Sequence, residues 1–355
     1  MKHAPEWFFV GGGYVSAPGG SHYAGQMYVE RYEPDERLHD TPVVMVHGGM
    51  QTGTNFTSTV DGRPGWAQDF LAAGYEVYVI DQPERGRSGH RLENNDAVAP
   101  QFRYTAERTT DYFTDPAGAK LWPTAERHTE WPGTGRMGDP MFDRFFASQV
   151  SQLADRDAIE AGARDGLIAL LDQIGPAILV THSQSGPFGW LVADARPELV
   201  KGILAIEPNG PPFKDIQFSG APDWFGYGEE IARAWGITRL PMTFDPSVKT
   251  PEDLRAALDP SLGTDELAPG YMPSSGPHTL PNLAGVPILI VAGEASYHAS
   301  YDHCTSEFLT WAGVDHDFQR LEDAGLTGNS HMIMMERNSA DIAALLMQWL
   351  AKRGL

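Results

Sequence analysis

Four short apolar runs constrain the fold of this chain more than any other feature. They read VVMVH, YEVYVI, AILVTH and VPILIVAG, and each is bounded by glycine, proline or polar residues. Strands buried on both faces are apolar almost throughout, whereas strands with one solvated face alternate. We therefore expect these runs to be the central strands of a mostly parallel sheet. The chain of 355 residues is long enough to bury such a sheet in one large domain.

Helical patterns alternate with strand patterns along the chain. We expect strands at 7–10, 23–32, 42–47, 75–80, 177–182, 201–206, 286–292 and 315–321, and helices at 66–73, 154–174, 186–195, 299–312 and 339–351. This alternation predicts an α/β fold with a mostly parallel sheet of about eight strands and helices on both faces. Two stretches rich in proline and glycine, 90–150 and 208–283, interrupt it. We interpret them as insertions into a single domain, 1–355, that form a lid or pocket wall.

The charge balance excludes several classes of partner. Acidic residues outnumber basic ones by 47 to 26, and the formal net charge is −21. Such a chain repels nucleic acid and anionic membranes at long range, and the same argument disfavours anionic substrates. The single cysteine, Cys304, excludes an intrachain disulfide. Since the chain also shows no leader pattern and no long apolar span, we expect a cytoplasmic protein, and its oligomeric state stays open.

The segment Val180–Gly186 carries the strongest chemical signal. It follows a buried strand and opens a helix, which is the setting of a nucleophile elbow. The strained turn requires small residues two positions before and after the nucleophile. Thr181 and Ser185 are small, although neither is the glycine usual in G-x-S-x-G. The alternative is a serine that only caps the helix. We predict that Ser183 is a nucleophile.

Two further motifs lie, like the serine turn, in loops that follow predicted strands. His47-Gly48-Gly49-Met50 follows the strand VVMV, and its glycines allow the backbone to approach a substrate closely. His331, in Gly328-Asn329-Ser330-His331, lies between the last predicted strand and the last helix. The glycine loop, the serine turn and the histidine loop follow one another along the chain, and this order makes the chain similar to the α/β-hydrolase superfamily over nearly its whole length. We interpret His47 and His182 as structural.

This resemblance implies a serine hydrolase with a Ser-acid-His triad, which requires no metal ion or organic cofactor. Serine alone is a weak nucleophile, so it needs a histidine to take its proton and a carboxylate to hold that histidine. The resemblance assigns Ser183 and His331 to the first two roles. It assigns the oxyanion hole to the N–H groups of Gln184 and of one residue among Gly48, Gly49 and Met50, with Gly49 or Met50 the expected donor.

The carboxylate of the triad departs from the common pattern of the superfamily. Most members place it three residues beyond a glycine after strand seven, but Gly293-Glu294-Ala295-Ser296 puts a serine there. Glu207 instead ends the strand 201–206, at the edge where ligands of parallel sheets bind. This resembles a subgroup of bacterial esterases with a Ser-Glu-His triad. We predict Glu207 as the acid and Glu294 as the alternative; Glu207 as a merely structural strand-end carboxylate remains open.

Other clusters of polar residues are discounted as sites. Two sets, His298, Asp302 and His303, and Asp315, His316 and Asp317, are interpreted as polar surface loops rather than metal ligands, because their spacing is poor for convergence. Aromatic residues of the insertions, among them Tyr104, Tyr112 and Phe113, are expected either to line a pocket or to pack the insertions onto the body of the domain.

The predicted function is the hydrolysis of small-molecule carboxylic esters through a serine acyl-enzyme. The same triad also cleaves amides, lactones or carbon–carbon bonds, so these reactions are the first alternative. The second alternative is a ligand-binding protein of hydrolase fold without turnover.

Overall fold

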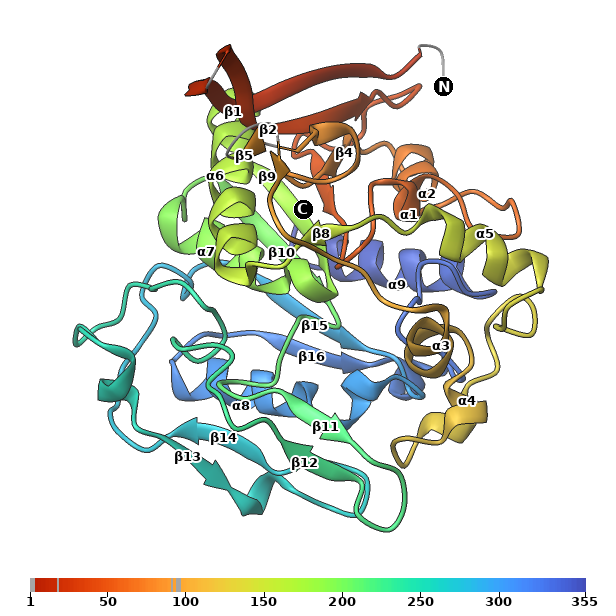
Figure 1. The fold of residues 1–355 in the computed structure, drawn as a ribbon, viewed down its shortest axis with the longest axis vertical. Helices are drawn as coiled ribbons and strands as arrows, with labels where there is room; N and C mark the ends of the chain where they lie inside the picture. The colour runs from red at the N-terminus through yellow and green to blue at the C-terminus, as the bar shows by residue number, and fades with distance from the viewer. Residues whose placement is uncertain (1–3, 18, 91, 94–96) are drawn as a thin grey trace.

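The computed structural model describes residues 4–17, 19–90, 92–93 and 97–355. An eight-stranded sheet crosses the molecule in the order β1-β2-β4-β3-β9-β10-β15-β16 (Figure 1). Its strands are β1 (Glu6–Ala17), β2 (Gly20–Tyr32), β3 (Val43–Val46), β4 (Val77–Asp81), β9 (Ala177–His182), β10 (Val200–Ile206), β15 (Ile288–Ala292) and β16 (Asp317–Arg320). The β1–β2 and β2–β4 pairs are antiparallel, and all other neighbours in the sheet are parallel. The predicted mostly parallel sheet is confirmed.

Helices cover both faces of the sheet, as predicted. The helices α6 (Arg156–Ile174), α7 (Gly186–Ala195) and α8 (Asp302–Trp311) pack on one face, and α2 (Trp66–Ala72) and α9 (Ser339–Ala351) pack on the other. Side chains alternate between the faces along each strand. In β9, Leu179 joins the first core and Ile178 and Val180 join the second. The central strands are apolar throughout because each has two buried faces.

The first strand is much longer than the predicted 7–10. It pairs with β2 from Glu6 to Ala17, through three consecutive glycines that the sequence pattern does not assign to a strand. Gly12 has φ of 70°, and a Cβ there would lie 2.6 Å from the backbone nitrogen of Gln26. Glycine at this position therefore lets the strands β1 and β2 approach each other closely, and the hairpin continues past it.

The 90–150 insertion consists of short elements. They are β5 (Leu92–Glu93), β6 (Ala97–Val98), β7 (Gln101–Phe102), α3 (Ala106–Thr109), the π-helical turn η3 (Thr110–Thr114), α4 (Pro116–Ala119), η4 (Ala125–Arg127) and α5 (Pro140–Ser148). The strand β8 (Gln152–Leu153) pairs with β7 just after this insertion.

The 208–283 insertion contains two small hairpins. Strand β11 (Ile216–Phe218) pairs with β12 (Phe225–Tyr227), and β13 (Ala256–Asp259) pairs with β14 (Gly270–Pro273). Between them lie the turns η6 (Pro251–Leu254) and η7 (Pro260–Leu262).

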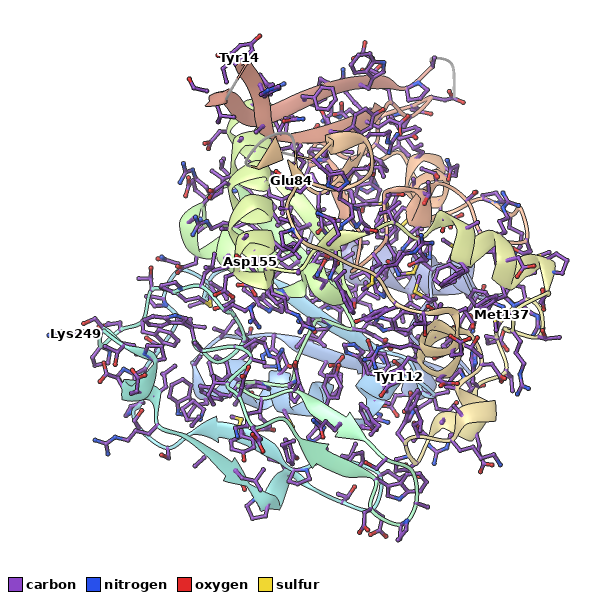
Figure 2. The ribbon with its side chains drawn as sticks, in the orientation of Figure 1. Tyr14, Glu84, Tyr112, Met137, Asp155 and Lys249 are labelled. Carbon is purple, nitrogen blue, oxygen red and sulfur yellow. The ribbon has the colours of Figure 1, made fainter. Side chains whose placement is uncertain are left out.

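The two insertions meet through aromatic rings. Tyr112 contacts Phe218 with ring centroids 6.3 Å apart, and both rings contact Tyr297 of the body. Figure 2 shows Tyr112 between α3 and the β11–β12 hairpin. Within the described residues, no helix is both long and apolar enough to cross a membrane.

Candidate active site

The turn between β9 and α7 holds Ser183 in a strained backbone conformation. Ser183 has φ of 54°, in the left-handed region that non-glycine residues rarely occupy. Ser185 fixes the turn: its hydroxyl accepts the N–H of His182 and donates to the carbonyl of Val46, both at 2.8 Å. The N–H of Asn209 donates to the Ser183 carbonyl at 2.8 Å. The half-buried Ser183 side chain therefore stands on a rigid, sharply turned support.

Gly48 brings the loop after β3 into contact with this turn. A Cβ at Gly48 would lie 2.9 Å from Nδ1 of His182 and 3.2 Å from Cβ of Ser183. Only glycine fits without displacing the loop or the nucleophile.

The backbone N–H groups of this loop differ in whether they already have a hydrogen-bond acceptor within the protein. The N–H of Gly48 donates to Oε1 of Gln51 at 3.3 Å, and the N–H of Met50 donates to Oε1 of Gln152 at 3.1 Å. In the part of the chain that the structure describes, the N–H groups of Gly49 and Gln184 have no hydrogen-bond partner. These two N–H groups are therefore available to donate to a ligand that enters the site.

A short hydrogen bond joins Glu207 to His331. Oε2 of Glu207 lies 2.6 Å from Nδ1 of His331, and both side chains are almost completely buried. Glu207 follows β10 with φ of 47°, another left-handed residue. This backbone turn lets the carboxylate leave the strand end and reach across to the loop before α9.

Two donors from the loop after β15 hold the same carboxylate. The N–H of Gly293 donates to Oε1 of Glu207, and the hydroxyl of Ser296 donates to Oε2, both at 2.7 Å. Burial raises the pKa of Glu207, and both donors oppose this rise because they bind the ionised form. Ser296 occupies the position where the resemblance places the common acid. Here it donates a hydrogen bond to the carboxylate that follows the neighbouring strand, β10.

The imidazole of His331 is uncharged at neutral pH. Burial lowers its pKa well below the usual range, and His182 and His298 lower it further. Its carbonyl accepts the Nε2–H of His182 at 3.0 Å, and its own Nε2 lies 3.3 Å from the hydroxyl of Tyr297. Burial keeps the pKa of Tyr297 far above its usual value, so that hydroxyl stays protonated. The sequence analysis did not single out Tyr297.

Glu294, the alternative acid, lies elsewhere in the site. Its Oε2 accepts the N–H of Gly328 at 2.9 Å, and its Oε1 lies 3.9 Å from Arg127. It thus supports the loop that carries His331, whereas Glu207 contacts the imidazole itself.

The prediction that His298 and Asp302 belong to a surface loop is wrong. His298 is 1% exposed and Asp302 is fully buried, and Nδ1 of His298 lies 2.9 Å from Oδ1 of Asp302. The His298 ring stacks on His331 with centroids 4.8 Å apart and an interplanar angle of 8°. His298 lies in the 3₁₀ turn Tyr297–Ser300 and Asp302 is the first residue of α8, and nothing local in the sequence indicated that this turn faces the core. His303, His316, Asp315 and Asp317 are half-buried or exposed.

One buried cluster has the composition of a metal site. Ligand atoms of Glu207, His298 and His331 lie within 4.8 Å of one another. Both ring nitrogens of His298 have hydrogen-bond partners, Asp302 at Nδ1 and the Tyr301 hydroxyl at 3.0 Å from Nε2. Glu207 and His331 bind each other. A metal ion would have to break all three contacts, so these residues fit a hydrogen-bond network better than a metal centre.

A buried arginine that the sequence analysis did not single out lies behind the loop after β3. The Arg85 guanidinium donates to the Gly48 carbonyl at 3.2 Å, to Gln152 Oε1 at 3.0 Å and to Gln184 Oε1 at 3.1 Å. Burial lowers its pKa to about 9, while Asp81 raises it, so the group is charged at neutral pH. Its positive charge favours a developing negative charge at the loop.

A cavity of about 90 Å³ joins these groups. Its lining includes Gly49, Met50, Ser183, Gln184, Tyr297 and His331, with Tyr104 and Phe113 from the first insertion. His47 and His182 are fully buried and do not line it. Burial lowers the pKa of each of these two histidines to about 3, so both are neutral packing residues.

Comparison with known proteins identifies the family. A sequence profile described as "Alpha/beta hydrolase family" matches residues 43–345. The chain belongs to this family. It is 41% identical over 352 residues to the "Probable secreted lipase phiG" of Fungal sp. (strain ATCC 74256), covering 98% of this chain and 89% of that protein. A solved structure titled "a Novel Bacterial Esterase" shares the α/β-hydrolase fold, with a TM-score of 0.64, 20% identity, and coverage of 98% and 95% of the two chains.

The prediction of a cytoplasmic protein is wrong. The fungal α/β-hydrolase relative, which matches nearly the whole chain, is named a secreted protein. The prediction relied partly on the single cysteine, but Cys304 is buried and unpaired. A lone buried thiol forms no disulfide in either compartment, so it does not report on location.

Proposed function

We propose that this α/β-hydrolase cleaves carboxylic esters through an acyl-enzyme on Ser183, with His331 as the base and Glu207 as its partner. The observation that carries the proposal is the 2.6 Å contact between Glu207 and the Nδ1 of His331, in a cavity that Ser183 also lines. The carboxylate holds the imidazole with Nδ1 protonated, which leaves Nε2 to accept a proton. The names of the fungal relative and of the bacterial esterase support ester substrates over amides, lactones or carbon–carbon bonds.

The proposed reaction has two halves. The Ser183 hydroxyl attacks the ester carbonyl and gives its proton to Nε2 of His331, and the carbonyl oxygen becomes an oxyanion that accepts the N–H groups of Gly49 and Gln184. When this intermediate collapses, the bond to the alcohol breaks and His331 returns the proton to the leaving oxygen. Water then attacks the acyl-enzyme with the same assistance, which releases the acid and restores Ser183.

We also propose that the 90–150 and 208–283 insertions form the lid of this site. Tyr104 and Phe113 of the first insertion line the nucleophile cavity, and Phe113 packs 5.0 Å from the His331 ring. A wall of aromatic residues excludes water and supplies apolar surface for the substrate. The secreted fungal relative also supports an extracellular location for this chain.

A matched set of chromogenic substrates tests the proposal. We expect the wild type to hydrolyse 4-nitrophenyl butyrate, with a burst of nitrophenol when acyl-enzyme accumulates, and to leave the corresponding 4-nitroanilide intact. Ser183→Ala and His331→Gln should abolish turnover and the burst. Turnover of the ester that survives Ser183→Ala, or faster cleavage of the anilide than of the ester, would contradict the proposal.

A further inference from the structure

A second cavity adjoins the one that contains the nucleophile. It has a volume of about 150 Å³ and shares part of its lining with the first cavity, namely Tyr104, Phe113, Arg156, Asn209 and Tyr297. Its remaining lining includes Arg108 and Asp215. A ligand bound at Ser183 and extended past Tyr297 would therefore reach these charged groups.

Arg108 presents its charge at this cavity without a carboxylate partner. Its guanidinium carbon lies 4.9 Å from the ring centroid of Tyr104 and 4.5 Å from that of Tyr112. Stacking on aromatic rings occupies the faces of the guanidinium, and its in-plane N–H groups can donate to a ligand as well as to the Tyr112 hydroxyl. Within the described residues, no carboxylate forms an ion pair with Arg108.

Arg156 contributes a second guanidinium that is only partly neutralised. Its Nη1 lies 3.5 Å from Oδ2 of Asp215, and its side chain is 51% exposed. Asp215 is also 2.8 Å from Nη1 of Arg233, which is fully buried. One carboxylate thus faces two guanidinium groups, and Arg108 lines the same cavity as that carboxylate.

Two other charged groups of the first cavity, Arg239 and Glu160, already have hydrogen-bond partners, and Glu229 and Glu230 line a further cavity together with Arg156. Arg239, which lines the first cavity, is paired with Asp157 at 2.6 Å. Burial raises the pKa of Glu160 to about 7, and this carboxyl already accepts the N–H groups of Arg239 and Leu240. The chain as a whole carries a net charge of −21. An arginine at a cavity without an ion-pair partner among the described residues is a local exception to the expectation that such a chain disfavours anionic substrates.

We propose that this second cavity binds a carboxylate of the substrate through Arg108 and Arg156. The substrate class is an ester that carries an acidic group at the end remote from the scissile carbonyl. This inference rests on the proposed ester hydrolysis and extends it to the charge of the substrate. Guanidinium groups bind a carboxylate through two parallel N–H donors, which fixes both position and orientation.

Two pairs of esters test the proposal on both sides of the scissile bond. The first pair is mono-4-nitrophenyl adipate and its carboxamide, which differ at the end of the acyl chain. The second is 4-acetoxybenzoate and 4-acetoxybenzamide, which differ on the leaving group. We expect kcat/KM to favour the acid over its amide by about tenfold or more in at least one pair, chiefly through KM, because a hydrogen bond to a charged group contributes this much. High salt should reduce the preference.

Variants assign the preference to the two arginines. Arg108→Gln and Arg156→Gln should each lower kcat/KM for the preferred acid by about tenfold to a hundredfold and change its amide by less than about threefold. Arg103→Gln is the matched control, because Arg103 also stacks on an aromatic ring, at 5.3 Å from Phe146, and lines neither cavity. It should leave the preference intact.

The outcomes separate this inference from the proposed function. Equal or faster hydrolysis of the amide in both pairs would overturn the carboxylate subsite while ester hydrolysis stands. Equal losses for acid and amide in the arginine variants would overturn it as well. If none of the four esters is hydrolysed in a Ser183-dependent reaction, the proposed function fails first and the subsite fails with it.

Discussion

Replacing Ser296 by alanine should change the pH dependence of the reaction. The Ser296 hydroxyl donates to Oε2 of Glu207 at 2.7 Å, on the oxygen that also contacts His331. A hydrogen bond to a charged group contributes about 1.5–3 kcal/mol, which corresponds to about one to two pKa units. Because the lost donor binds the ionised carboxylate, the pKa of Glu207 should rise by that amount. Glu207 must be ionised to hold Nδ1–H of His331. As the pH is lowered, the variant should therefore lose activity at a higher pH than the wild type does.

The assay is a profile of kcat/KM against pH. For Ser296→Ala we expect the acidic limb to move up by about one to two pH units, so that kcat/KM on that limb falls by about tenfold to a hundredfold and recovers at alkaline pH. Ser296→Thr keeps a hydroxyl and should restore most of the profile. A uniform loss at every pH, or an unchanged limb, would refute the reasoning.

Stability is the control for this variant. The Ser296 hydroxyl also accepts the N–H of His298 at 3.2 Å, and loss of such a cap costs about 1 kcal/mol in the free energy of unfolding. Thr264→Ala removes a comparable hydroxyl, which accepts the N–H of Leu267 at 3.0 Å and has no contact with Glu207 among the described hydrogen bonds. It should lower stability similarly without moving the pH profile.

Three further predictions concern the acid, the oxyanion loop and a buried carboxyl. Glu207→Gln should lower kcat by about a thousandfold or more, because the negative charge beside the imidazolium is lost and the amide NH2 group favours the wrong histidine tautomer. Glu294→Gln should cost about tenfold or less, and kcat of the two purified variants decides between them. Gly48→Ala should lower kcat/KM by about a hundredfold, because its Cβ would displace the nucleophile turn, and Gly49→Ala, whose Cβ meets nothing closer than 3.4 Å, should cost much less. The pKa of Glu160, raised by burial from 4.5 to about 7, contributes stability that is present below pH 4.5 and lost as pH rises through 7. The wild type should therefore lose up to about 3 kcal/mol of unfolding free energy over that range, and Glu160→Gln should not, as urea denaturation at several pH values would reveal.

The sheet was predictable because its central strands are buried on both faces. An apolar run such as AILVTH is stable chiefly as a strand that is buried on both faces. The residues of the candidate site directly follow such strands, at the carboxyl edge of the sheet. The structure places Glu207 and His331 in contact, although the sequence separates them by 124 positions. Strand order and connection rules bring such ends together, so this pairing could be anticipated.

The supporting groups were less predictable because their roles depend on long-range contacts. Nothing local to Arg85 indicates that its guanidinium contacts the loop at Gly48, and nothing local to Tyr297 indicates that its hydroxyl lies near His331. The burial of His298 likewise depends on how the loop before α8 packs against β15 and the His331 loop. The insertions have short elements without strong periodicity, so the sequence located them without predicting their internal structure.

The most direct test of the account is covalent labelling of the nucleophile. The folded protein would be incubated with a fluorophosphonate, its intact mass measured, and any adduct mapped by peptide mass spectrometry. The account predicts one adduct per chain, on Ser183, and none on folded Ser183→Ala. An unlabelled wild-type protein that is shown to be folded, or an adduct that persists in Ser183→Ala, would contradict the claim that Ser183 is the activated nucleophile.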